Sequence, residues 1–99
     1  MLEIKKTLEE GKMTLAVDGK LDTNNSPRLL EEFNASIEDV NEVVIDLENM
    51  EYLSSAGLRV LLSMQKIMNQ KGEMTIVNAS QDVMEIFDMT GFTQLLNIK

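Results

Sequence analysis

Two adjacent hydroxyl side chains, Ser54 and Ser55, stand directly before an apolar stretch with helical spacing. A helix N-terminus presents unpaired backbone N–H groups and the positive end of the helix dipole. A serine placed there can cap the helix, and a phosphate on that serine is electrostatically favoured. Capping is the commoner use of such a serine. The pair therefore predicts an N-cap and, as the second interpretation, a phosphoacceptor.

Two further residues deserve a functional interpretation beside a structural one. Gly57 falls in the first turn of the predicted helix, where close packing against a sheet is the favoured interpretation and clearance for a partner approaching Ser55 is the second. Asp22 ends a strand-like segment. It either caps the turn into the next helix or contacts a partner, and its residue type alone favours the cap.

The residue inventory excludes several kinds of chemistry. The chain has no Cys and no His, so disulfides, thiolate chemistry, Cys-based metal sites and a Ser-His-Asp triad cannot form. It also lacks the phosphate-binding glycine loop of the P-loop type. We therefore expect no enzyme activity, no metal site and no cofactor.

Composition and charge are typical of a cytoplasmic globular domain. The 99 residues are 43% apolar and 26% charged, with a formal net charge of −8. That balance disfavours direct nucleic-acid binding, which needs basic patches. No apolar run approaches the ~18 residues of a membrane span, and the N-terminus does not resemble a signal peptide. The acidic charge fits either a basic patch on a partner protein or simple solubility, and charge alone favours solubility.

Alternating apolar residues predict strands in the N-terminal part of the chain. Leu2 and Ile4 alternate with polar neighbours, and residues 13–17 alternate strictly, which is typical of half-buried strands. Residues 9–12 between them have the composition of a turn. We therefore expect the two strands to pair as a hairpin.

The segment after the hairpin has helical spacing. Ser26 is suited to be an N-cap and Pro27 to the first helical position. Apolar side chains then recur at intervals of three and four residues, at Leu30, Phe33 and Ile37. The spacing predicts a first helix over this segment.

The middle of the chain predicts a buried strand followed by a second helix. Val43–Ile45 is β-branched and does not alternate, which is typical of a strand covered on both faces. Residues 46–53 mix polar and apolar side chains and predict the end of the strand and a loop. The second helix is expected to begin between Ser54 and Ala56 and to end near Gln70.

The C-terminal third predicts one more strand and one more helix. Gly72 stands where a C-terminal glycine of the second helix is expected. Residues 74–77 predict a strand, Ser80 the cap of a third helix and Gly91 its end. Residues 95–98 then predict a short strand or a helical turn.

The order β-β-α-β-α-β-α predicts a fold class. Successive strand–helix–strand units imply a parallel sheet with right-handed crossovers, and the hairpin adds an antiparallel edge. We expect an α/β fold forming a single domain over residues 1–99. Its mixed, mostly parallel sheet should have about four or five strands, with residues 43–47 near the centre and helices packed mainly on one face.

The second predicted helix is more apolar than one packed face requires. Its apolar residues span roughly 220° of the circumference at helical spacing, whereas packing on one side needs an arc of about 100° or somewhat more. They are Leu58, Val60, Leu61, Leu62, Met64, Ile67 and Met68. The excess indicates either burial between neighbouring elements or contact with a partner.

Three motifs together resemble one protein family. Residues 46–58 resemble the signature segment of STAS domains in the branch of anti-sigma-factor antagonists: Asp-Leu, a short variable stretch, an aromatic residue, then Asp-Ser-Ser/Thr/Ala-Gly-Leu. Residues 19–22 are similar to that family's Gly-x-Leu/Ile-Asp after the second strand. Residues 87–92 are similar to its Phe-x-x-Thr/Ser-Gly-Leu/Phe at the end of the third helix. The resemblance covers nearly the whole chain and implies a STAS-like single domain.

The resemblance also implies a mechanism. In that family the serine two positions before the glycine, here Ser55, accepts phosphate from a partner that is both anti-sigma factor and serine kinase. The unphosphorylated protein binds this partner and releases the sigma factor, the phosphorylated protein does not bind, and a metal-dependent serine phosphatase acts transiently to reset it. The kinase supplies ATP and Mg²⁺, so the resemblance implies no cofactor and no catalysis by this chain. The implied partner-binding residues are Asp22, Ser54, Ser55, Ala56, Gly57 and Leu58.

One departure from the pattern keeps an alternative open. Ser54 stands where the family has Asp before the phosphoacceptor, and a serine can replace the capping role of that Asp but not a role in orienting the hydroxyl. The alternative is a STAS module that serves structural interaction, without phosphorylation, in a larger transporter-associated or stress-sensing complex.

Overall fold

The structure, a computed structural model, describes all residues from 1 to 99. It is an α/β fold built on a five-stranded sheet. Its elements in chain order are β1 (Leu2–Glu9), β2 (Lys12–Leu21), α1 (Ser26–Ser36), the 3-10 turn η1 (Ile37–Asp39), β3 (Glu42–Asp46), β4 (Met50–Leu53), α2 (Ser55–Asn69), β5 (Glu73–Val77), α3 (Gln81–Thr90) and the 3-10 turn η2 (Phe92–Gln94).

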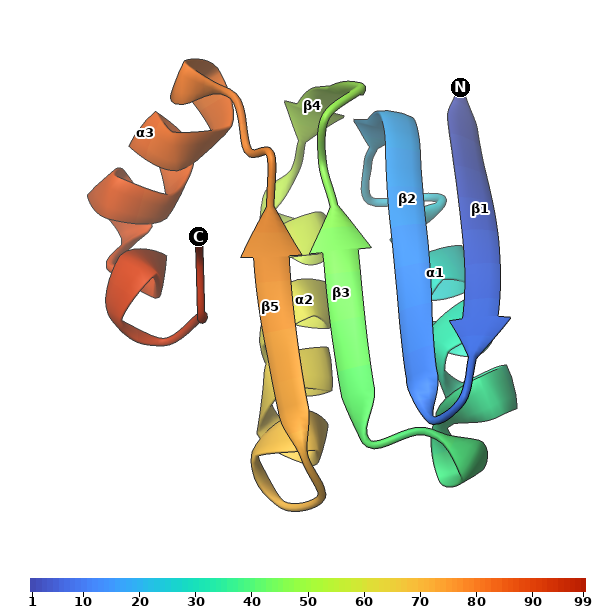
Figure 1. Cartoon of the computed structure of the whole chain (residues 1–99). Coiled ribbons are helices and arrows are strands. Elements are labelled where there is room, and N and C mark those ends of the chain that lie inside the picture. The colour runs from blue at the N-terminus through green and yellow to red at the C-terminus, as the bar shows by residue number, and fades with distance from the viewer.

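The sheet has the order β1-β2-β3-β5, and β4 pairs with β2 beyond the end of β3. The hairpin β1–β2 is antiparallel, and the other pairings are parallel. Helices α1 and α2 lie behind one face of the sheet, the other face is bare, and α3 lies beside β5 (Figure 1). The predicted mixed sheet, with helices on one face and β3 at its centre, is therefore confirmed.

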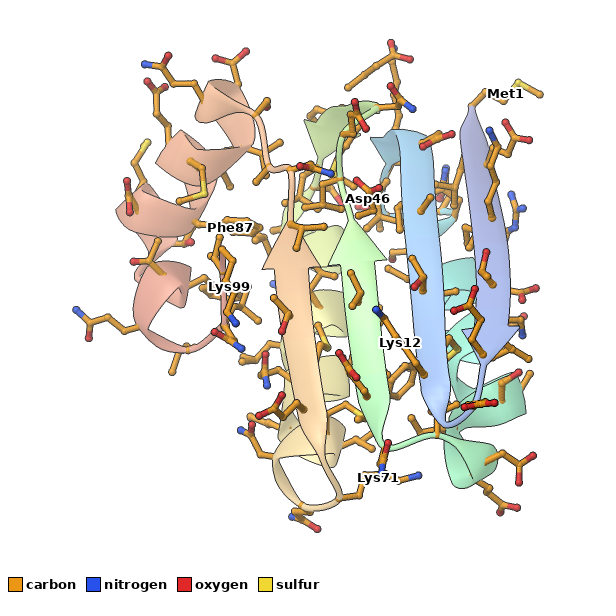
Figure 2. All side chains as sticks on the ribbon, in the orientation of Figure 1. Met1, Lys12, Asp46, Lys71, Phe87 and Lys99 are labelled. Carbon is orange, nitrogen blue, oxygen red and sulfur yellow. The ribbon has the colours of Figure 1, made fainter.

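The expectation that β3 is covered on both faces is wrong. Val43 and Ile45 are buried beneath the helices, whereas Val44 and Asp46 are half-exposed on the other face. Lys12 of β2 lies on this uncovered side as well (Figure 2). A β-branched residue fits a pleated surface even when it is only half-buried. The unalternated run therefore reflects β propensity at Val44 and not a second covering layer.

The short strand β4 was not predicted. Its residues pair with the end of β2, with Gly19 opposite Met50 and Leu21 opposite Leu53. Only the first and last of its four residues are buried, so the segment shows no period of two for a sequence pattern to detect. The loop expected at residues 46–53 is instead a turn followed by this strand.

Two helix ends differ from the prediction in detail. The N-cap of α1 is Asn25, so Ser26 is the first helical residue and Pro27 the second. Gly72 does follow α2, and its N–H donates to the carbonyl oxygen of Met68 at 2.8 Å. It does not adopt the left-handed conformation of a glycine cap; a Cβ at that position would lie 1.9 Å from the carbonyl oxygen of Asn41. Close approach of two backbones explains this glycine.

The ends of α3 confirm the prediction. The Ser80 hydroxyl accepts a hydrogen bond from the Val83 N–H at 3.2 Å, which caps the helix. At the other end Gly91 has a φ of 79°. This left-handed conformation is the one that favours glycine after a helix.

Residues 95–98, expected to form a short strand or a helical turn, form only a single strand-like bridge, and the helical turn η2 (Phe92–Gln94) lies just before them. After η2, Ile98 forms a single parallel bridge with Ile76 of β5. The buried Gln65 side chain of α2 holds this segment, because its Oε1 accepts a hydrogen bond from the Asn97 N–H at 3.3 Å and its Nε2 donates to Asn69 Oδ1 at 2.9 Å. One buried polar side chain thus joins the end of the chain to the core.

Candidate functional site

The candidate site forms where β2 and β4 end side by side. Leu21 pairs with Leu53, and the Ser54 N–H donates to the carbonyl oxygen of Leu21 at 2.9 Å. Because parallel strands end at the same edge of a sheet, the residues that follow them emerge next to each other. Asp22 and Ser54 are therefore brought together although they are far apart in the chain.

Ser54 is the N-cap of α2 and is hidden from solvent. Its backbone is extended, with φ −84° and ψ 169°. Its Oγ accepts a hydrogen bond from the Gly57 N–H at 3.0 Å, and the residue is only 7% exposed. The hydroxyl is thus committed to one of the unpaired N–H groups of the helix, as the capping interpretation predicted.

Ser55 is the first residue of α2 and is exposed. Its side chain stands at the positive end of the helix dipole, where an added anion is stabilised. The two serines therefore differ in accessibility although they are neighbours. One serves the fold, and the other is presented at the surface.

The other residues of α2 predicted to contact a partner are buried or half-buried. Gly57 is buried, and a Cβ there would lie 2.9 Å from both Leu21 Cδ2 and Leu53 Cδ1. Close packing, the favoured interpretation of this glycine, is therefore its role in the structure. Leu58 belongs to the hydrophobic core, and Ala56 is half-buried.

Asp22 organises the turn between β2 and α1. Its Oδ1 accepts hydrogen bonds from the N–H groups of Asn24 and Asn25, each at 2.9 Å. The Asn25 side chain in turn accepts from the Asp22 N–H at 2.8 Å and donates to the carbonyl oxygen of Lys20 at 2.9 Å. The half-buried carboxylate thus acts as a turn cap through one oxygen. Its other oxygen makes no hydrogen bond within the chain and can accept one from outside.

Sequence reasoning did not single out Tyr52 as a surface residue of this site. Tyr52 is 51% exposed and pairs in β4 with the exposed Lys20 of β2. It lies two residues before the N-cap, at the same strand ends as Asp22. Aromatic residues are enriched at protein interfaces. An aromatic residue two positions before the predicted helix cap is the sequence feature that could have identified Tyr52.

The candidate site does not lie in a pocket. The four hollows of the molecule are lined by other residues, and none includes Asp22, Ser54 or Ser55. Small ligands bind in concave pockets, whereas protein partners bind extended surfaces.

The structure contains no cluster of three or more acidic side chains that could hold a metal ion. None of its helices is long and apolar enough to cross a membrane.

Comparison with known proteins gives one consistent family. The antagonist of anti-sigma F factor from Paenibacillus polymyxa is 28% identical over 100 residues, which cover 98% of this chain and 86% of that protein. A crystal structure of an anti-sigma factor antagonist from Mycobacterium paratuberculosis superposes with a TM-score of 0.88 at 21% identity, over 99% of this chain and 85% of that one.

A second structure, of the Bacillus cell fate determinant SpoIIAA in its phosphorylated form, superposes with a TM-score of 0.76 at 14% identity, over 100% of this chain and 91% of that one. At these identities the two superpositions show a shared fold. Residues 3–99 match the family defined by the STAS domain. The match includes the strand ends, the capped helix and the exposed serine described above, and the chain therefore belongs to the STAS domain family.

Proposed function

We propose that this protein is an anti-sigma-factor antagonist. It binds an anti-sigma factor through the surface around Ser55 and thereby releases a sigma factor, and phosphate on Ser55 ends the binding. One observation carries this proposal: Ser55 of this STAS chain is exposed at the N-terminus of α2, directly after the buried cap Ser54. The Paenibacillus polymyxa relative, which is named as an antagonist of this kind, supports it.

Accessibility favours Ser55 over Ser54 as the phosphoacceptor. A kinase must reach the hydroxyl, and the hydroxyl of Ser54 is buried and hydrogen-bonded to the Gly57 N–H. Phosphate on Ser54 would remove the cap of α2 and would require the buried site to open. Phosphate on Ser55 requires neither change.

The effect of the phosphate follows from its charge. It adds about −1.5 to −2 at neutral pH, together with three acceptor oxygens. The N-terminus of α2 stabilises this charge within the protein, so the fold is retained. A partner surface that fits the neutral hydroxyl closely meets both new charge and new bulk, so the complex is lost.

The partners in this proposal are proteins. The anti-sigma factor is itself the serine kinase and brings ATP and Mg²⁺, and a metal-dependent serine phosphatase binds transiently to remove the phosphate. In this cycle the chain is a cytoplasmic regulator that catalyses nothing and needs no cofactor of its own. It contacts neither nucleic acid nor membrane directly.

Ser54 gives the alternative function its one supporting observation. The STAS antagonist pattern has Asp at this position, and Ser54 supplies a buried cap without a carboxylate. If the kinase needs that carboxylate, the chain is a STAS interaction module of a larger transporter-associated or stress-sensing complex and is not phosphorylated.

Intact-mass spectrometry separates the two functions. The wild type, Ser55→Ala and Ser54→Ala are each incubated with ATP and the purified anti-sigma factor kinase of the source organism. We expect one phosphate on the wild type and on Ser54→Ala, and none on Ser55→Ala. Phosphate on Ser55→Ala but not on Ser54→Ala would reverse the assignment, and an unmodified wild type would support the alternative.

Asp22 provides a second test, on binding alone. Only one of its carboxylate oxygens is used in the turn, so Asp22→Lys should weaken the complex by about 1–3 kcal/mol if the other oxygen meets a basic group of the partner. Because the reversal also removes the turn hydrogen bonds, Asp22→Asn serves as the control, since its amide oxygen can still accept them. Calorimetry that gives equal affinity for all three proteins would remove Asp22 from the interface.

A further inference from the structure

The exposed face of α2 has a different charge from the rest of the chain. The protein carries a net charge of −8, yet no acidic residue occurs between Glu51 and Glu73. The same segment contains three basic residues, Arg59, Lys66 and Lys71. The local charge of α2 is thus opposite to that of the molecule.

Two of these basic residues belong to a line of exposed side chains along α2. Ser55, Arg59, Ser63 and Lys66 recur at intervals of three and four residues, so they lie along one side of α2, and all four are exposed. Ile67, which is 39% exposed, lies next to this line. We call these five residues the α2 ridge. The opposite side of the helix is formed by core residues: Leu58, Leu61, Met64 and Met68.

The two charges of the α2 ridge have no partner within the chain. The only ion pairs of the structure are Lys5–Asp18 and Lys6–Glu32. Lys66 lies in the last turn of α2, where it complements the helix dipole. Arg59 lies only one turn from the positive end, so the dipole does not stabilise it. The fold itself therefore gives no reason for a cation at Arg59.

The surroundings limit the range of this positive charge. Carboxylates occur at Glu31 and Glu32 of α1, which packs against α2, and at Asp82, Glu85 and Asp88 of α3, which lies beside β5. At physiological ionic strength the Debye length is about 8 Å. A distant molecule therefore meets the net negative charge of the protein, and only a surface in close contact meets the α2 ridge. The ridge is suited to holding a docked partner in register and not to attracting it from afar.

We propose that the α2 ridge is a docking surface for a carboxylate-bearing surface of the anti-sigma factor. This inference rests on the proposed function and extends its interface from Ser55 along α2. Charge complementarity identifies the occupant, because Arg59 and Lys66 can each pair with a carboxylate. Ile67 adds apolar contact next to them. The partner surface then carries a basic group opposite Asp22 and acidic groups opposite α2.

The α2 ridge also explains how a phosphate on Ser55 weakens partner binding. Ser55 and Arg59 are four residues apart on one side of the helix, which places a phosphate on Ser55 within reach of the guanidinium. The phosphate withdraws Arg59 from the partner and places negative charge at the head of the ridge. The carboxylates of the partner then meet repulsion where they previously met a cation.

Neutralising each basic residue tests the ridge. Arg59→Gln and Lys66→Gln are compared with Lys12→Gln, the matched control, which removes one exposed and unpaired positive charge from the uncovered face of the sheet (Figure 2). The affinity for the purified anti-sigma factor of the source organism is measured by calorimetry at low and at physiological salt. Thermal unfolding curves confirm that all three variants are folded.

We expect each ridge variant to raise the dissociation constant of the complex by roughly three- to tenfold, and Lys12→Gln to raise it by less than about twofold. The difference in affinity between the wild type and each ridge variant should become smaller as the salt concentration is raised. If the wild type binds while the ridge variants bind as well as Lys12→Gln does, the ridge is not a docking surface and the proposed function stands. If the wild type does not bind the anti-sigma factor, both proposals fail.

Discussion

Replacing Ser54 by alanine removes the side-chain hydrogen bond that caps α2. The Ser54 Oγ accepts from the Gly57 N–H at 3.0 Å in a buried position. Loss of a serine cap typically costs about 1 kcal/mol. A buried N–H group left without a partner costs about 1–3 kcal/mol. These two effects describe the same hydrogen bond, so we expect a loss of about 2 kcal/mol in the free energy of unfolding.

Ser80 offers a matched control within the same chain. It caps α3 by the same geometry, with its Oγ 3.2 Å from the Val83 N–H, but it is exposed. Water can replace its hydroxyl there, so Ser80→Ala should cost about 1 kcal/mol or less. For a domain of this size 1 kcal/mol corresponds to a change in Tm of roughly 4–8 °C. Ser54→Ala should therefore lower Tm by roughly 8–16 °C, and clearly more than Ser80→Ala does.

Urea unfolding followed by circular dichroism measures both free energies, and thermal unfolding measures both Tm values. Ser54→Asp keeps an acceptor at the N-cap and should recover most of the loss. If Ser54→Ala is no more destabilising than Ser80→Ala, burial does not make the Ser54 cap stronger than the Ser80 cap. That result would mean that solvent reaches the Gly57 N–H despite its burial.

Other positions give predictions of the same kind. Gly72→Ala should unfold the protein or cost several kcal/mol, because its Cβ would lie 1.9 Å from the Asn41 carbonyl oxygen, and a urea titration would show this. Gly91→Ala should cost only about 1 kcal/mol, since its φ is 79° but nothing lies within 4 Å of the new Cβ; an equal loss for both glycines would contradict the close-approach argument. Gln65→Leu keeps the side-chain volume but leaves the Asn97 N–H without its acceptor. Hydrogen exchange at Asn97 and at the Lys99 amide should then accelerate while the rest of the sheet stays protected, and unchanged exchange there would show that Gln65 does not hold the C-terminal segment.

Local patterns were sufficient for most elements of this fold. The hairpin, the three helices and the strand at residues 74–77 depend on alternation, helical spacing and end signals such as Ser80 and Gly91, all of which act between residues close in the chain. The sequence-based predictions were wrong where one local pattern is compatible with two different structures. Val44 is β-branched because it suits a strand, and the sequence does not show whether a second layer covers it. Gly72 is a glycine because of Asn41, which lies far away in the sequence.

The candidate site likewise has features that follow from local sequence and features that depend on distant contacts. From the sequence alone it follows that catalysis by Cys or His is impossible and that two hydroxyl side chains, Ser54 and Ser55, stand at the start of a helix. The tertiary structure was needed to show which of the two serines is accessible, that Asp22 lies beside Ser54, and that the basic residues of α2 face outward as one line. The unpredicted pairing of β4 with β2 brings Asp22 to Ser54. Burial and proximity arise from contacts between distant parts of the chain, and a local sequence pattern carries no information about which distant segment will lie alongside it.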